Sequence, residues 1–162
     1  MLEEYIVRKL EYKDIDEIYF LCKENKRFYE FCPPMVSIKS IKDDMIILPK
    51  GKTLKDKYYE GFYKGDKLVA IIDLITNYPD EETCFIGFFM VDINVQNKGI
   101  GSYIINAVCD ELKRNNYKNV RLAWIEDDKK AEYFWHKNGF KDLEKKLDQN
   151  SHNVIEAIRV LI

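Results

Sequence analysis

The spacing of apolar residues changes along the chain and predicts where strands and helices lie. Residues 5–10 alternate weakly between apolar and polar side chains, which is typical of a strand. Apolar residues then recur at helical spacing over residues 15–23, where Asp14 and Glu17 have the spacing of a capping box. The chain is therefore predicted to begin with a strand, followed by a helix that Asp14 caps.

Residues 27–37 form an aromatic-rich segment that contains Pro33 and Pro34. The two prolines bar a helix from running across this segment. A second helix is predicted to start near Ser37 and to end before Pro49.

Three strand-like runs follow, at residues 58–63, 68–75 and 84–91. Turn-forming residues at 64–66 and 77–80 link them. Links as short as these join antiparallel strands, so the three runs are predicted to form a meander.

Helices and strands alternate in the next part of the chain. An apolar residue at every fourth position over residues 100–112 predicts an amphipathic helix, and a strand is predicted at 120–124. This strand is expected to run parallel to the strand at 84–91, because a helix crosses between them. A further helix is predicted at 129–137, with Gly139 as its left-handed C-terminal residue.

The last two runs, 140–147 and 154–162, predict a hairpin. The element order is then β-α-α-β-β-β-α-β-α-β-β. This order predicts an α/β (α+β) fold with a mixed, mostly antiparallel sheet of about seven strands flanked by four helices. A chain of 162 residues is expected to form a single domain over residues 1–162.

Composition and charge narrow the classes of function. The formal net charge is -2, and the charged residues are scattered, so the chain lacks the basic stripe of a nucleic-acid-binding protein. No apolar run approaches the roughly 18 residues of a membrane span, and the acidic Glu3 and Glu4 do not fit a signal peptide. The four cysteines and two histidines show no disulfide or metal-ligand spacing. We expect a cytoplasmic protein with no metal and with no nucleic-acid or membrane partner.

The loop VQNKGIGS, residues 95–102, lies between the strand at 84–91 and the helix that follows. The first N–H groups of a helix lack partners within the helix and carry partial positive charge, which suits an anion. Gly99 and Gly101 let the backbone approach a ligand closely, because no Cβ stands in the way. The alternative interpretation is an ordinary turn before a helix.

Three phosphate-binding motifs can be compared with this loop. The dinucleotide fingerprint G-x-G-x-x-G requires a third glycine where Ile104 stands. The P-loop pattern that would end at Thr53 requires a glycine where Ile46 stands. The third pattern, Q/R-x-x-G-x-G/A, fits residues 96–101.

The third pattern resembles the acyl-CoA-binding loop of the GNAT superfamily of N-acyltransferases. Residues 131–140, AEYFWHKNGF, are similar to that family's later A-x-x-F-Y-x-K-x-G-F segment. The order of elements also matches, so the resemblance covers essentially the whole chain. It implies the acyl-CoA N-acyltransferase fold, acetyl-CoA as acyl donor, and an amine, small or on a protein, as acceptor. It also allows a homodimer, since dimers are common in the family.

The resemblance assigns cofactor contacts residue by residue. Those expected to face pantetheine are Met90, Val91 and Ile93. Those expected to wrap the pyrophosphate are Gln96, Asn97, Lys98, Gly99, Ile100, Gly101 and Ser102. Asp128 stands where an asparagine is usual, and Phe134 and Lys137 are expected near the rest of the cofactor.

No catalytic residue is assigned, because the sequence departs from the family pattern at two positions. Trp135 stands where the family has the tyrosine that protonates the leaving thiolate, and Phe85 stands where a base glutamate is frequent. The family's oxyanion contact implies a backbone N–H near Met90 or Val91. A non-catalytic acyl-CoA-binding module and a phosphate-binding module of another enzyme class remain as alternatives.

The acceptor is expected to bind between the first two helices and the sheet. The candidate substrate-binding residues are Phe28, Tyr29, Glu30 and Phe31. An aromatic wall with one carboxylate suits a cationic amine. The alternative is that the phenylalanines of this group simply fill the core. Asp73 points either into the same cleft or into solvent.

Overall fold

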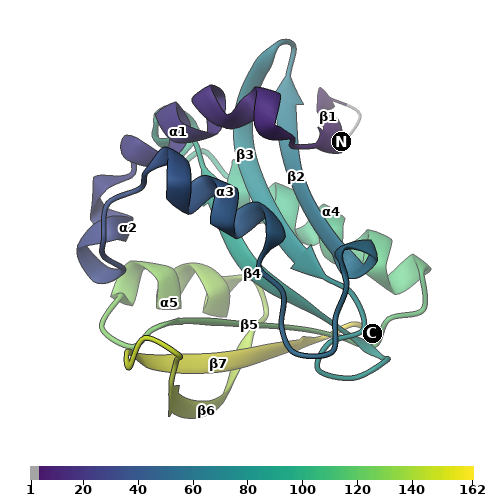
Figure 1. Cartoon of the computed structure of the whole chain (residues 1–162). Coiled ribbons are helices and arrows are strands. Elements are labelled where there is room, and N and C mark those ends of the chain that lie inside the picture. Colours follow the sequence, from purple (N-terminus) through teal and green to yellow (C-terminus); the bar gives the residue numbers. More distant parts are fainter. Residues whose placement is uncertain (1–3) are drawn as a thin grey trace.

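The computed structural model describes residues 4–162, so Glu3 lies outside the described residues. They form a seven-stranded sheet with helices on both faces (Figure 1). The strands are β1 (Ile6–Lys9), β2 (Lys57–Lys64), β3 (Lys67–Ile75), β4 (Thr83–Val91), β5 (Asn119–Ile125), β6 (Lys141–Leu147) and β7 (Asn153–Val160). The helices are α1 (Ile15–Lys23), α2 (Lys26–Phe31), α3 (Ile38–Ile46), α4 (Ile100–Arg114) and α5 (Lys129–Lys137). Short 3-10 turns are η2 (Tyr12–Asp14), η3 (Leu54–Asp56) and η4 (Ile93–Val95).

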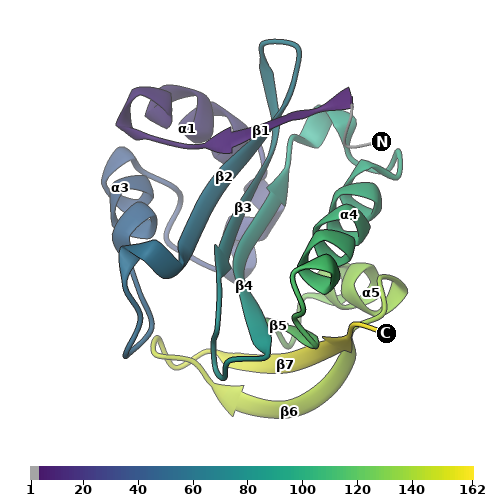
Figure 2. The same ribbon diagram turned by 90° about the vertical axis from the view of Figure 1, so that its right-hand side faces the viewer.

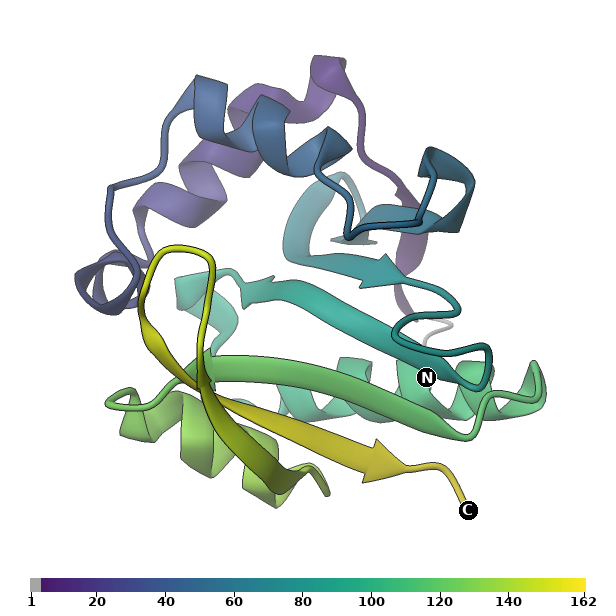
Figure 3. The same cartoon turned by 60° about the horizontal axis from the view of Figure 1, so that its bottom comes forward.

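The strand order is β1-β2-β3-β4-β5-β7-β6. Every neighbouring pair is antiparallel except β4 and β5, which are parallel as the crossover through α4 predicted. The last strand, β7, lies between β5 and β6, with α5 on one face of the β5–β7 pair (Figure 3). The meander, the final hairpin and the mixed sheet are therefore confirmed.

One helix was missed by the sequence analysis. The prediction of four helices omitted α2, which ends at Phe31, before Pro33 and Pro34. The prolines do prevent a helix from crossing the segment, but the six residues Lys26–Phe31 before them form a helix. Isolated helices this short are unstable in water, so contacts with the rest of the molecule must hold α2 in place.

The capping box predicted at the start of α1 is wrong. The Asp14 side chain makes no capping hydrogen bond to α1. It accepts instead from the Glu11 N–H at 2.8 Å and from the guanidinium of Arg8 at 2.9 and 3.1 Å. The hydrogen bond from Arg8 holds the pKa of Asp14 below its ordinary value. The contact with β1 decides the orientation of the side chain, and local spacing does not reveal it.

Two separate groups of buried side chains lie on the two faces of the sheet. One group lies between the sheet and the helices α4 and α5, and it includes Ile104 and Ile105 of α4 and Leu122 of β5. The other packs beneath α1 and α3 and includes Ile18 and Ile41. Figure 2 shows α1 and α3 on one side of the sheet and α4 and α5 on the other. No helix within residues 4–162 is both long enough and apolar enough to cross a membrane.

The sheet opens between β4 and β5. These strands pair only at their beginnings, and the last paired residues are Phe85 and Arg121. Beyond them the strands diverge (Figure 1), so the rest of the β4 edge that faces β5 has no strand partner. A register shift against β3, opposite Gly87, bends β4 where it leaves β5.

Candidate functional site

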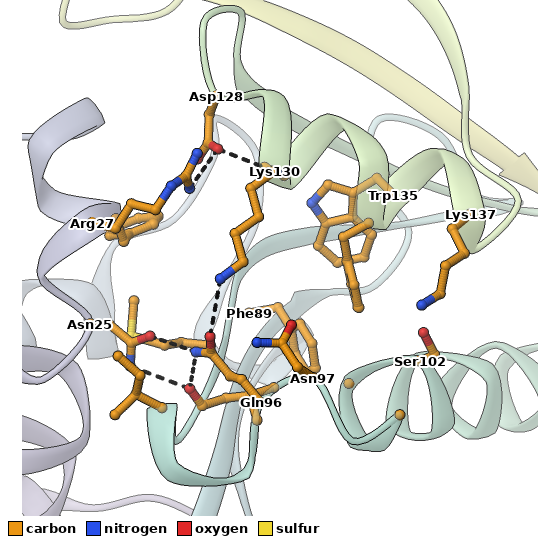
Figure 4. A pocket seen from close by; sticks show the side chains of 18 residues that line it. Asn25, Arg27, Phe89, Gln96, Asn97, Ser102, Asp128, Lys130, Trp135 and Lys137 are labelled. Atoms are coloured by element: carbon orange, nitrogen blue, oxygen red, sulfur yellow. Dashed lines mark hydrogen bonds and ion pairs between the residues drawn. The ribbon is translucent and has the colours of Figure 1, made fainter.

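A cavity of about 260 Å³ lies at the opening between β4 and β5 (Figure 4). All predicted cofactor residues except Lys98 and Ile100 line it, namely Met90, Val91, Ile93, Gln96, Asn97, Gly99, Gly101, Ser102, Asp128, Phe134 and Lys137. Other lining residues were not assigned to the cofactor from the sequence, namely Asn25, Arg27, Phe89, Lys130, Ala131 and Trp135. Several of these come from α2 and the start of α5, which the loop motif does not include.

The N-terminal end of α4 forms one wall of the cavity. Gly99 caps the helix in the left-handed conformation, with φ of 81°. The Gly99 carbonyl accepts the first backbone hydrogen bond of the helix, from the Tyr103 N–H at 3.0 Å. The N–H groups of residues 100–102 therefore have no partner within the helix, and the fifteen-residue helix adds its dipole there. This wall is suited to an anion.

The two glycines of the loop are required for different reasons. A Cβ at Gly99 would meet no atom within 4 Å, so the left-handed backbone is what favours glycine there. A Cβ at Gly101 would lie 3.0 and 3.2 Å from ring atoms of Phe134. Gly101 thus lets α4 pack closely on α5, and a larger side chain would disturb that packing as well as the approach of a ligand.

The free edge of β4 forms the floor of the cavity. The Val91 carbonyl accepts from Gln96 Nε2 at 2.8 Å and from Asn25 Nδ2 at 3.3 Å, so it faces the opening. The Asp92 N–H bonds to β3 instead. Because backbone groups alternate along a strand, Met90 also faces β3, and Phe89 faces the opening with Val91. Of the two oxyanion candidates, only the Val91 amide is directed toward the cavity.

Charged side chains gather around the opening. The Asp128 side chain accepts from the Ala131 N–H at 3.1 Å and caps α5. Arg27 pairs with it at 2.9 Å. Lys130 Nζ lies 3.5 Å from Gln96 Oε1. The lining therefore carries more positive than negative side chains.

A sequence comparison identifies the family to which this arrangement belongs. A model of the acetyltransferase (GNAT) family matches residues 12–140. The chain belongs to the GNAT acetyltransferase family. The resemblance inferred from the loop and from residues 131–140 is confirmed.

Solved structures share the GNAT fold along nearly the whole chain. An acetyltransferase from Thermus thermophilus matches with a TM-score of 0.78 and 14% identity over 97% of each chain. A spermidine N-acetyltransferase from Vibrio cholerae, in complex with CoA and spermine, has a TM-score of 0.72 and 17% identity over 98% of this chain and 96% of that chain. The ribosomal-protein-S18-alanine N-acetyltransferase from Escherichia coli has a TM-score of 0.69 and 14% identity, covering 97% of this chain and 94% of that chain. At these identities the likeness shows the fold alone.

A relative in Bacillus subtilis (strain 168), the uncharacterized protein YxbD, is 29% identical over 89 residues. The match covers 55% of this chain and about half, 52%, of YxbD. This match does not indicate a substrate.

The two departures from the GNAT pattern have different surroundings. Trp135 lines the cavity and also packs edge-on against Phe89, Phe134 and Phe140, at centroid distances of 6.0, 4.8 and 5.3 Å. It therefore fills the core, while one edge borders the cavity (Figure 4). Phe85 packs against Tyr78 at 5.7 Å and does not line the cavity.

Of the predicted acceptor residues, only Phe28 lines the cavity. It packs edge-on against Tyr29 at 4.9 Å and Phe88 at 5.7 Å. Burial raises the pKa of Tyr29, which lies among protein atoms away from the cavity. Phe31 lies beneath the Arg27 guanidinium, 4.9 Å from its ring centroid, and Glu30 is exposed. Of the two phenylalanines, only Phe28 packs against the core beneath α1 and α3, so the core-packing alternative is supported for that residue alone.

Other polar candidates lie outside the cavity. Asp73 does not point into solvent: it is buried, pairs with Lys57 at 3.0 Å and does not line the cavity. The histidines pair with nearby carboxylates and do not line the cavity. One of them, His136, forms a group with Glu132 and Asp142 whose ligand atoms lie within 4.8 Å of one another. Sequence spacing did not indicate this group, because Asp142 comes from another element.

Proposed function

We propose that the protein is an acetyl-CoA-dependent N-acetyltransferase that acts on a primary amine by direct attack in a ternary complex. The observation that carries the proposal is the convergence of unpartnered α4 amides and the free edge of β4 on one cavity. Family membership supports the reaction class. The structures that share this fold include N-acetyltransferases, one of them in complex with CoA and spermine, which supports an amine acceptor.

The residues present fit the parts of acetyl-CoA. The amides of residues 100–102 can hold the diphosphate, and hydrogen bonds of this charge-assisted kind contribute about 1.5–3 kcal/mol each. The free backbone groups of Phe89 can pair with the amide groups of the pantetheine arm. Lys130 and Lys137 add positive charge to the lining. Acetyl-CoA supplies the acetyl group as an activated thioester.

Transfer requires a neutral amine. An alkylamine with a pKa near 10.4 costs about 4.6 kcal/mol to deprotonate at pH 7. Its nitrogen then forms the C–N bond while the C–S bond breaks, and it releases one N–H proton to solvent. The Val91 N–H is directed to stabilise the carbonyl oxygen. The indole of Trp135 is too weak an acid to protonate the thiolate, so solvent supplies that proton, which a thiol of pKa near 8.5 readily allows.

A non-catalytic acyl-CoA-binding module is the second candidate. One observation favours it: within residues 4–162, the ionisable side chains that line the cavity are only Arg27, Asp128, Lys130 and Lys137. No tyrosine, histidine or glutamate borders the cavity in this part of the chain.

Two measurements on the whole chain separate these functions. Calorimetry with coenzyme A tests binding, and acceptor-dependent release of free thiol from acetyl-CoA, across a panel of primary amines, tests transfer. We expect binding and turnover with at least one amine. Tight binding without turnover would favour the second candidate, and absence of coenzyme A binding would contradict both.

A further inference from the structure

A negatively charged side chain lies in the wall of a cavity proposed for a polyanion. The Asp128 side chain is 9% exposed and borders the same space as the α4 amides. A carboxylate there opposes the approach of phosphate groups, because like charges at low local dielectric repel strongly. Its charge must therefore be balanced by the protein.

Two contacts hold this carboxylate. The Ala131 N–H donates to Asp128 Oδ1 at 3.1 Å, as part of the cap of α5. Arg27 Nη1 lies 2.9 Å from the same oxygen. Within residues 4–162, no other acidic side chain lines the cavity, and Arg27 is the cation paired with this one.

Arg27 and Asp128 come from distant parts of the sequence. It belongs to α2, whereas Asp128 follows β5, and Figure 4 shows the arginine extending across the opening to the carboxylate. The guanidinium rests on the ring of Phe31, 4.9 Å from its centroid, while the side chain is 44% exposed. The ion pair therefore joins the two sides of the cavity and is only partly desolvated.

We propose that Arg27 is a positioning residue for the acyl-CoA ligand, which neutralises Asp128 and holds it against the N-terminus of α5. The inference rests on the proposed function and deepens it. Asp128 is the buried member of the pair, and removing its partner leaves its charge uncompensated. Without Arg27, an unneutralised carboxylate remains in a cavity proposed for a polyanion.

A double-mutant cycle with coenzyme A as the titrant tests this role. The variants are Arg27→Met, Asp128→Asn and the two together, because methionine keeps the apolar stem and asparagine keeps an oxygen for the Ala131 N–H. We expect Arg27→Met to weaken binding about tenfold. The double variant should regain most of that loss, because the charge left unpaired has been removed.

A control variant and a salt titration separate this role from a general loss of structure. Arg114 pairs with Glu111 at 2.7 Å on the exposed side of α4, so Arg114→Met removes a similar ion pair away from the cavity and should leave the affinity unchanged. The deficit of Arg27→Met should also shrink at high salt, since screening weakens the repulsion from Asp128.

The outcomes are distinct. Recovery in the double variant supports the proposal. Equal weakness of Arg27→Met and the double variant would overturn it, as would an Arg27→Met variant that binds coenzyme A as tightly as the wild type. A wild-type protein that does not bind coenzyme A would overturn the proposed function, and this inference with it.

Discussion

The two walls of the cavity differ in what they present to a ligand: one presents backbone groups and the other presents side chains. The wall formed by residues 96–102 and the start of α4 presents backbone amides, and its shape depends on the left-handed Gly99. The wall formed by α2 presents side chains, chiefly Asn25 and Arg27. A backbone wall needs only a short local pattern, whereas a side-chain wall needs residues from distant segments to meet.

Asn25 shows how the second wall is held. It is buried, and its Nδ2 donates to the Leu21 carbonyl at 3.0 Å and to the Val91 carbonyl at 3.3 Å. Its Oδ1 accepts from Gln96 Nε2 at 2.7 Å. One amide therefore joins α1, the end of β4 and the glycine loop. The position of α2 follows from these contacts more than from the helix propensity of six residues.

The largest effect on coenzyme A binding is expected where the backbone wall depends on the left-handed conformation of Gly99. Gly99→Ala places a Cβ on a residue with φ of 81°, and Gly51→Ala does the same at φ of 85°, with open space around both. Each substitution should lower the free energy of unfolding by about 1–2 kcal/mol. Only Gly99→Ala should also weaken coenzyme A binding, by about tenfold, because it displaces the α4 amides.

Calorimetric titration and urea unfolding of both variants check this prediction. Gly51 does not line the cavity, so it reports the cost of strain alone. Equal coenzyme A affinities for the two variants would show that the loop amides do not contact the ligand.

A smaller effect on coenzyme A binding is expected in the side-chain wall. Asn25→Leu removes three hydrogen bonds and leaves the Leu21 carbonyl without that partner. Net losses of about 1 kcal/mol per buried hydrogen bond predict a lower midpoint of urea unfolding. Coenzyme A binding should weaken only about threefold, since Gln96 still donates to Val91 and holds the loop.

The matched variant is Gln96→Leu, which removes the link to Asn25 and the bond to Val91 but keeps both bonds that Asn25 donates. It should weaken coenzyme A binding more than Asn25→Leu does. The reverse order would show that the bonds to Leu21 and Val91, rather than the link to Gln96, position the loop.

The same difference explains what could be predicted from the sequence. The strands, four of the helices and the glycine loop follow from periodicity and local chemistry, and all were found. Gln96 lines the cavity, but its side chain binds Asn25 and Val91 within the protein. Asn25 and Arg27 carry no local signal, because their partners lie in β4, the loop and the start of α5. Asp14 was misread for the same reason, since Arg8 approaches it from β1.

The smallest effect is expected away from both walls, on α3. Asp44 is exposed, yet the surrounding protein limits its hydration and, with the nearby Asp73 carboxylate, raises its pKa to about 6. The folded protein then holds this proton more tightly than the unfolded chain does. The free energy of unfolding should therefore fall as the pH rises from about 4 to about 6, and this contribution should stay constant above that range.

Asp44→Asn removes this penalty. Above pH 6 the variant should be more stable than the wild type, by less than about 1 kcal/mol because the carboxylate is exposed, and the difference should vanish near pH 4. Urea unfolding of both proteins at the two ends of this range measures the change. Coenzyme A affinity should not move, since Asp44 does not line the cavity. A change in that affinity would show that Asp44, on α3, is coupled to the cofactor site. The α3 side of the sheet and the cavity would then have to be treated as one site.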